Sequence, residues 1–110
     1  MSLRVSTQEI GGHMVLVFDG ALDVSSVPQL SDALTRHVRP TGTIVLDLDE
    51  ITVLDDTAIG ILLGAAARQR ESGGMLGIVC TNPAIVDRLR RSGVGAAIPV
   101  GSSVHDITSP

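Results

Sequence analysis

Two short apolar segments constrain the fold of this chain more than any other feature. They occupy residues 43–48 (TIVLDL) and 75–80 (MLGIVC). Strands that are buried on both faces of a sheet have such short, nearly continuous runs of Val, Ile and Leu. Around them lie longer stretches in which apolar residues recur at helical spacing. Strands that alternate with helices in this way indicate an α/β fold with parallel strand pairs.

The remaining strands extend this pattern to one mixed sheet. Residues 3–9 alternate weakly, and a glycine turn separates them from a compact apolar run at 13–18, which predicts a hairpin. A short final strand is expected at 97–100. The sequence therefore predicts a mixed sheet of about five strands with helices packed mainly on one face. A length of 110 residues suits a single domain over 1–110.

Three helices and a terminal turn are expected between and after these strands. Ser26 and Gln29 have the spacing of a capping box, so the first helix should begin there. The second helix is expected over 55–71, and the third begins at Pro83 with Asn82 as its cap. The serines at 102–103 are candidate caps of a terminal turn.

The charge balance and the shortage of aromatic residues argue against nucleic-acid and membrane binding. The chain has twelve acidic side chains and eight basic ones, all of them Arg, and Phe18 is its one aromatic residue. Nucleic-acid binding needs a basic surface and often stacking rings, and anionic membranes attract basic segments. The longest apolar run, 58–67, is about half as long as a bilayer requires, and the N-terminus lacks the apolar core of a signal peptide. We therefore expect a cytoplasmic protein.

No residue pattern indicates catalysis, a metal or a cofactor. Cys80 is the single cysteine, which excludes an intrachain disulfide and a cysteine-based metal cluster, and the three histidines lack metal-ligand spacing. Ser102, Ser103, His105 and Asp106 are close in sequence. Catalytic triads assemble across a fold, however, and no Gly-x-Ser-x-Gly elbow is present. We expect neither enzymatic activity nor a bound cofactor.

The segment LDDTAIGILLG at 54–64 places Asp55, Asp56 and Thr57 at the start of the second helix. Asp and Thr are good helix caps, and acids there complement the helix dipole, so capping explains one of them. Three polar side chains exceed what a cap needs, and sites in α/β sheets lie at the carboxyl ends of strands. A hydroxyl in a first helical turn is also suited to carry phosphate. Thr57 is thus a candidate phosphoacceptor, with capping as the structural alternative.

Small residues recur along the second helix at Gly60, Gly64 and Ala67. Each glycine inside a helix costs about 1 kcal/mol relative to alanine. Two of them indicate that another backbone approaches this helix closely, and that backbone belongs either to the sheet or to a partner protein. The sequence leaves both readings open.

Three segments together resemble the STAS domains of bacterial anti-sigma factor antagonists. In that family a strand leads through an Asp-Ser-Ser/Thr-Gly-Leu-Gly segment into a helix, as in LDLDEITVLDDTAIGILLGAAARQRESGG at 46–74. The upstream GALDVSSVPQL resembles the family's Gly-Glu-Leu-Asp segment. The downstream GGMLGIVCTNPAIVDRLRRSGV resembles its glycine turn, buried strand and Asn-Pro-led helix. The likeness extends over residues 18–100.

The resemblance implies a regulator of transcription that acts by partner switching. Family members bind an anti-sigma factor, often a serine/threonine kinase of the GHKL ATPase type, and thereby free the sigma factor. The kinase phosphorylates the hydroxyl that aligns with Thr57, which releases the antagonist. The resemblance leaves room for a phosphatase that resets the switch and for a weak homodimer. Nucleotide binding belongs to the partner, and this chain has no Walker-type segment.

The resemblance also suggests which residues meet the partner. Asp23 aligns with the acid of the upstream loop, and Asp55 with the Asp that precedes the hydroxyl pair. The other expected partner-binding residues follow Asp55 in the second helix: Asp56, Ala58, Gly60, Ile61 and Gly64. Asp56 stands where the family usually has Ser, and Ala58 where it usually has Gly. Asp56 adds a fixed charge beside the acceptor, which could alter kinase affinity or partly imitate phosphorylation.

Two other functions are alternatives to this one. Stand-alone STAS domains also serve as accessory subunits that dock on a transporter ATPase or permease, in which case Thr57 is a binding residue without a phosphorylation switch. The sequence does not separate that alternative from the first. A phosphoreceiver domain is a poor match, because receivers use a lysine near the last strand and this chain has none.

Overall fold

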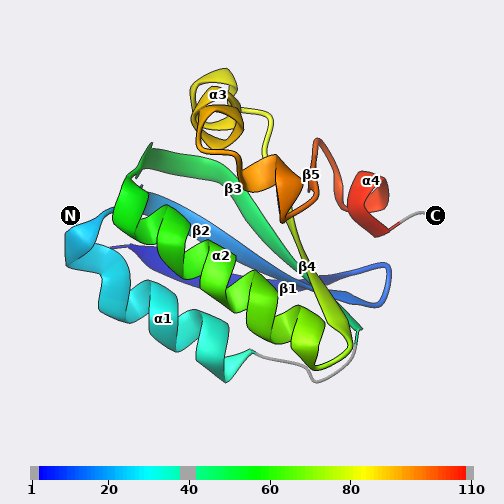
Figure 1. Ribbon diagram of the computed structural model, residues 1–110. Coiled ribbons are helices and arrows are strands. Elements are labelled where there is room, and N and C mark those ends of the chain that lie inside the picture. Colours follow the sequence, from blue (N-terminus) through cyan, green and yellow to red (C-terminus); the bar gives the residue numbers. More distant parts are fainter. Residues whose placement is uncertain (1–2, 38–41, 109–110) are drawn as a thin grey trace.

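The computed structural model describes residues 3–37 and 42–108, which form a five-stranded mixed sheet in the order β1-β2-β3-β4-β5 (Figure 1). The strands are β1 (Arg4–Ile10), β2 (His13–Leu22), β3 (Gly42–Leu54), β4 (Gly74–Val79) and β5 (Val100–Gly101). β1 and β2 form an antiparallel hairpin, and every following pair is parallel. The predicted mixed sheet is confirmed.

Three helices pack on one face of the sheet, and a fourth lies on the other. They are α1 (Val27–Arg36), α2 (Asp56–Glu71), α3 (Pro83–Arg91) and α4 (Val104–Thr108), with short 3₁₀ turns at η1 (Val24–Ser26) and η2 (Val94–Ala96). Figure 1 shows α1 and α2 crossing the sheet next to each other, with α3 beside the last part of β3. The helices therefore lie mainly on one face, as the sequence predicts.

The main core is almost entirely aliphatic. Phe18 is the one aromatic residue of the chain and is fully buried between the sheet and the helices. Fully burying one such side chain contributes about 1.5–3 kcal/mol. The largest side chains that share 0% exposure with it are Leu16, Leu22, Leu30, Leu46, Leu48, Leu62, Ile78 and Ile98. Branched residues on the strands and small residues on the helices fill the space that aromatic rings would otherwise take.

Strand β3 is longer than the predicted segment 43–48. Beyond Leu48 it continues to pair with β2 through two register shifts, between Val17 and Asp19 and between Gly20 and Ala21. The sequence does not indicate this extension, because three of the four residues at 49–52 are polar. The fourth, Ile51, is buried. As a result β3 ends beside the end of β2, and both strands lead into helices at the same edge of the sheet.

The first helix does not begin with the predicted Ser26–Gln29 capping box. The Ser26 hydroxyl makes no cap bond to α1; it donates to the Ala21 carbonyl over 2.7 Å and accepts the Asp23 N–H over 3.0 Å. The Gln29 side-chain amide donates to the Leu3 carbonyl over 3.0 Å instead. Spacing alone could not distinguish these bonds, because the competing acceptors come from β2 and from the segment before β1.

The final strand is shorter than the predicted 97–100 and lies later. Gly93 adopts a left-handed conformation with φ of 79°, and the chain then turns through η2. The Ala97 and Ile98 N–H groups both donate to the Val94 carbonyl, over 2.9 and 2.8 Å. Because the turn occupies these residues, pairing with β4 begins only at β5.

Two glycines allow α4 to lie on the outer face of the sheet. Ile107 of α4 packs with Val15, Val45 and Val79 in a second, smaller core. A Cβ at Gly77 would overlap Ile107, and a Cβ at Gly101 would lie 2.8 Å from the Cβ of Asp106. The absence of side chains at these two positions therefore determines how closely the C-terminal helix can approach.

Replacing Gly77 tests this packing. Gly77→Ala should lower the free energy of unfolding by about 1–3 kcal/mol, because Ile107 must move to make room. Gly60→Ala is the matched control: its added Cβ meets no described atom within 4 Å, so it should stabilise α2 by about 0.5–1 kcal/mol. Urea unfolding of both variants measures the difference, and wild-type stability of Gly77→Ala would contradict the packing described.

Candidate functional site

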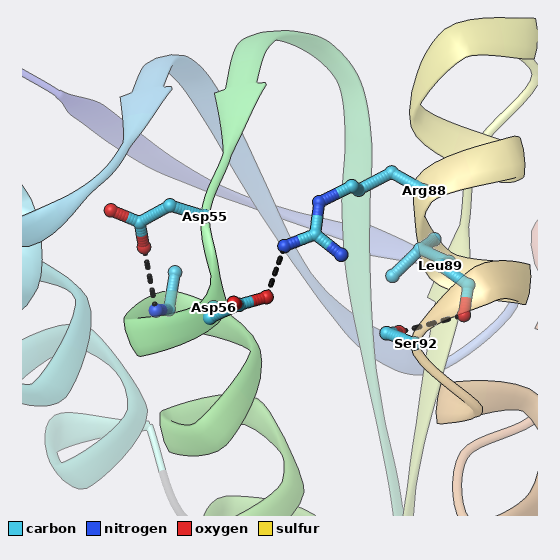
Figure 2. Close-up of polar contacts among 6 residues, drawn as sticks. Asp55, Asp56, Arg88, Leu89 and Ser92 are labelled. Atoms are coloured by element: carbon cyan, nitrogen blue, oxygen red, sulfur yellow. Dashed lines mark hydrogen bonds and ion pairs between the residues drawn. The ribbon is translucent and has the colours of Figure 1, made fainter.

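Asp55 is the N-cap of α2. Its backbone is extended, with φ of −98° and ψ of 173°, and its carboxylate accepts the Ala58 N–H over 3.0 Å (Figure 2). Its own N–H donates to the Leu22 carbonyl over 3.0 Å, which ties the start of α2 to the end of β2. Helix capping is thus the correct interpretation for Asp55. Asp56 and Thr57 do not cap the helix.

Asp56 points away from Asp55, toward α3. Its carboxylate forms an ion pair with the guanidinium of Arg88, as Figure 2 shows. The Asp56 side chain is 93% exposed, whereas that of Arg88 is 30% exposed. The sequence pattern does not predict this contact. The only signal was the row of arginines on α3, which cannot show a contact between residues 32 positions apart.

Thr57 carries the hydroxyl that remains free. It is the second residue of α2 and is exposed. Within the described part of the chain its side chain makes no hydrogen bond. The three polar residues of the motif therefore have three different states: Asp55 caps the helix, Asp56 pairs with Arg88, and Thr57 faces solvent.

The outward face of α2 is shallow. We call Thr57, Gly60, Gly64 and Ala67 the α2 surface; they recur at helical spacing along the side away from the core. A Cβ at Gly60 would meet no described atom within 4 Å, and one at Gly64 would meet only Arg68 of the same helix, at 3.4 Å. Close approach of the sheet is therefore not the reason for either glycine, and of the two readings left open by the sequence that one is wrong.

One predicted partner-binding residue does not lie on this face. Ala58 is 1% exposed and packs in the main core, and its N–H is held by the Asp55 cap. It is buried because it lies a helical turn before Leu62, on the face of α2 that covers the sheet. Ile61 is half-buried and also contacts the main core, so it reaches the surface only in part.

The loop that follows β2 lies beside the start of α2, because Leu22 pairs with Leu54. Asp23 in this loop accepts the Ser25 hydroxyl over 2.6 Å and the N–H groups of Ser25 and Ser26 over 3.0 and 3.3 Å. These hydrogen bonds lower the pKa of Asp23, and the bond from the Ser25 hydroxyl has the largest effect. The structure thus brings together the two segments that the sequence singled out, with the Asp23 carboxylate engaged in capping η1.

The remaining candidate side chains have structural roles. Cys80 is 3% exposed, and burial raises the pKa of its thiol, so it is not an activated nucleophile. Ser102 donates its hydroxyl to Asp106 over 2.7 Å, and the Asp106 N–H donates to Ser103, which confirms the predicted cap of the terminal turn. No set of three or more potential ligands in residues 3–37 and 42–108 could hold a metal. Over the same ranges, no helix has the length and apolarity needed to span a bilayer.

Comparisons with known proteins found a curated relative, similar solved structures and a matching family model. An anti-sigma F factor antagonist from Paenibacillus polymyxa is 25% identical over 104 residues, covering 91% of this chain and 87% of that protein. The crystal structure of an anti-sigma factor antagonist from Mycobacterium paratuberculosis has a TM-score of 0.82 at 22% identity, covering 96% of this chain and 90% of that one. The phosphorylated form of the Bacillus cell fate determinant SpoIIAA has a TM-score of 0.62 at 17% identity, covering 88% and 90%. The STAS domain model matches residues 4–107, and this chain therefore belongs to the STAS domain family.

Proposed function

We propose that this protein is an anti-sigma factor antagonist that acts by partner switching. In this proposal it binds an anti-sigma factor of the GHKL kinase type, and phosphorylation of Thr57 by that kinase ends the binding. The observation that carries the proposal is the exposed hydroxyl of Thr57, which makes no hydrogen bond to any described residue. It lies at the start of a helix whose outward glycines are not required by close packing in that part of the chain. The name of the Paenibacillus polymyxa relative supports the general role.

The α2 surface is suited to close contact with another protein. Glycine in a helix costs about 1 kcal/mol relative to alanine, and neither Gly60 nor Gly64 offsets that cost by close packing against the residues that the structure describes. A partner backbone can approach α2 at these positions. Val24 and Val53, 68% and 45% exposed, lie at the same edge of the sheet and add apolar area to the contact.

The acceptor chemistry requires nothing of this chain beyond Thr57. The kinase brings ATP; the threonine oxygen forms a bond to the γ-phosphorus, the bond to the β-phosphate oxygen breaks, and ADP leaves. The hydroxyl proton passes to a base of the kinase. The exposed and unbonded hydroxyl of Thr57 can enter such a site without unfolding α2, since the Asp55 cap does not involve it.

Phosphorylation would alter this surface strongly. It adds about −1.5 to −2 charges at neutral pH, beside Asp55 and Asp56. Partner groups that accept a neutral hydroxyl would then face a cluster of negative charge. A loss of about 3 kcal/mol, which is roughly a hundredfold in affinity, is within the range for such a mismatch.

The test is phosphorylation by candidate kinases. We would incubate the full chain with ATP and each GHKL-type anti-sigma kinase of its genome, and measure intact mass. Wild type should gain one phosphate and Thr57→Ala none. Thr52→Ala is the matched control, because Thr52 is another exposed threonine near this edge, and it should be modified like wild type. If no active kinase modifies the wild type, the switch is wrong, and docking on a transporter without phosphorylation becomes the better reading.

A second test addresses docking itself. Gly60→Gln should weaken binding of the cognate anti-sigma factor by about tenfold or more, because a long side chain separates the partner from α2. The fold should tolerate the change, since a Cβ at Gly60 meets no described atom within 4 Å. Gly95→Gln is the control, as Gly95 is also exposed with open space around it and lies in η2. The affinities are measured by calorimetric titration. If Gly60→Gln binds as tightly as wild type, the α2 surface is not the interface.

A further inference from the structure

One ion pair joins the candidate acceptor helix to a different element. Of the three ion pairs in the described part of the chain, those of Asp32 with Arg36 and of Asp87 with Arg91 lie within single helices. The pair of Asp56 with Arg88 bridges the first residue of α2 and the middle of α3. Arg88 thus places a positive charge at the residue directly before Thr57.

Arg88 is held in place from its own helix. Its neighbour Leu89 is 1% exposed, and Ile85 one turn earlier is 5% exposed, so α3 is anchored on the main core. The Arg88 side chain itself is mostly covered, and Figure 2 shows it reaching from α3 across to the start of α2. The helix that carries Arg88 is therefore fixed by packing, and the guanidinium is held by its bond to Asp56.

The guanidinium still has donors to offer. An arginine has five N–H donors, and within the described residues only Nη2 of Arg88 makes a hydrogen bond, to Asp56. A phosphate has three acceptor oxygens and more charge than a carboxylate, and arginine binds it through paired hydrogen bonds. A phosphate on Thr57 would lie one residue from the carboxylate that Arg88 already holds.

We propose that Arg88 is the counter-ion of the Thr57 switch: it neutralises Asp56 before modification and binds the phosphate of phosphothreonine 57 afterwards. This inference rests on the proposed function only in taking Thr57 as the acceptor. It also gives Asp56 a role. Before modification Asp56 and Arg88 sum to zero charge, so the carboxylate does not imitate a phosphate. After modification the same group of side chains carries about −1.5 to −2.

The test installs the phosphate without a kinase. Phosphothreonine is placed at position 57 of the full chain by amber-codon suppression, and the second ionisation of the phosphate is followed by ³¹P NMR against pH. A nearby cation favours the dianion, so Arg88→Gln should raise the midpoint by about 0.3 pH units or more. Arg91→Gln removes the same charge from α3 but breaks only a pair within that helix, so it should shift the midpoint by less than about 0.1 pH units. A failed kinase screen would leave this result unaffected, so the two proposals can fail separately.

Competition with Asp56 provides the second comparison. In an Asp56→Asn background the effect of Arg88→Gln should be larger than in the native background, because no carboxylate then competes for the guanidinium. The Arg88 Nε–H resonance gives a readout that needs no substitution, and it should move when Thr57 carries phosphate. Equal midpoints for Arg88→Gln and Arg91→Gln, or an unmoved Arg88 resonance, would overturn the proposal.

Discussion

The long parallel pairing of β2 with β3 is the constraint on which the candidate site depends. β3 stops pairing with β4 at Asp47 but stays paired with β2 as far as Leu54. The two register shifts keep these strands together until both reach the same edge of the sheet. The Asp55 N–H then donates to the Leu22 carbonyl, so the loop after β2 and the first turn of α2 begin side by side. Without this extension the Asp23 loop and Thr57 would not share a surface.

The three polar residues at the start of α2, Asp55, Asp56 and Thr57, differ in their interactions. A cap needs one carboxylate, and Asp55 supplies it. The charge of Asp56, directly before Thr57, is paired with that of Arg88. Thr57 is neutral and unbonded within the described residues, which makes it the position where a modification changes the most. The departure of Asp56 from the family pattern thus comes with a partner of opposite charge on α3.

The sequence was sufficient for features that depend on local periodicity. The order of strands and helices, the second helix and its Asp cap, and the terminal turn were all predictable, because apolar spacing and cap residues act over a few positions. The length of β3 was not, because polar residues on its outer face hide a buried Ile51. Ser26, Gln29 and Arg88 were misread or missed because their partners lie on other elements. Ala58 was misplaced because matching a motif does not tell which face of a helix is buried.

These observations also separate the fold of the chain from its use. The aliphatic core and the two glycines beneath α4 explain stability. In contrast, close packing within the described residues requires no glycine at positions 60 and 64, and the Thr57 side chain makes no hydrogen bond there. Residues that the fold does not need, gathered on one helix near the exposed Val24 of η1 and Val53 of β3, are what an interaction surface requires. The proposed partner switching accounts for them with a single change of charge.

The most direct measurement is the affinity of the cognate anti-sigma factor for this protein with and without phosphate on Thr57, determined by calorimetric titration. Partner switching predicts tight binding of the unmodified chain and binding about a hundredfold weaker after phosphorylation, equivalent to about 3 kcal/mol. Equal affinity of the two forms would contradict it, because the charge on Thr57 would then have no bearing on the partner.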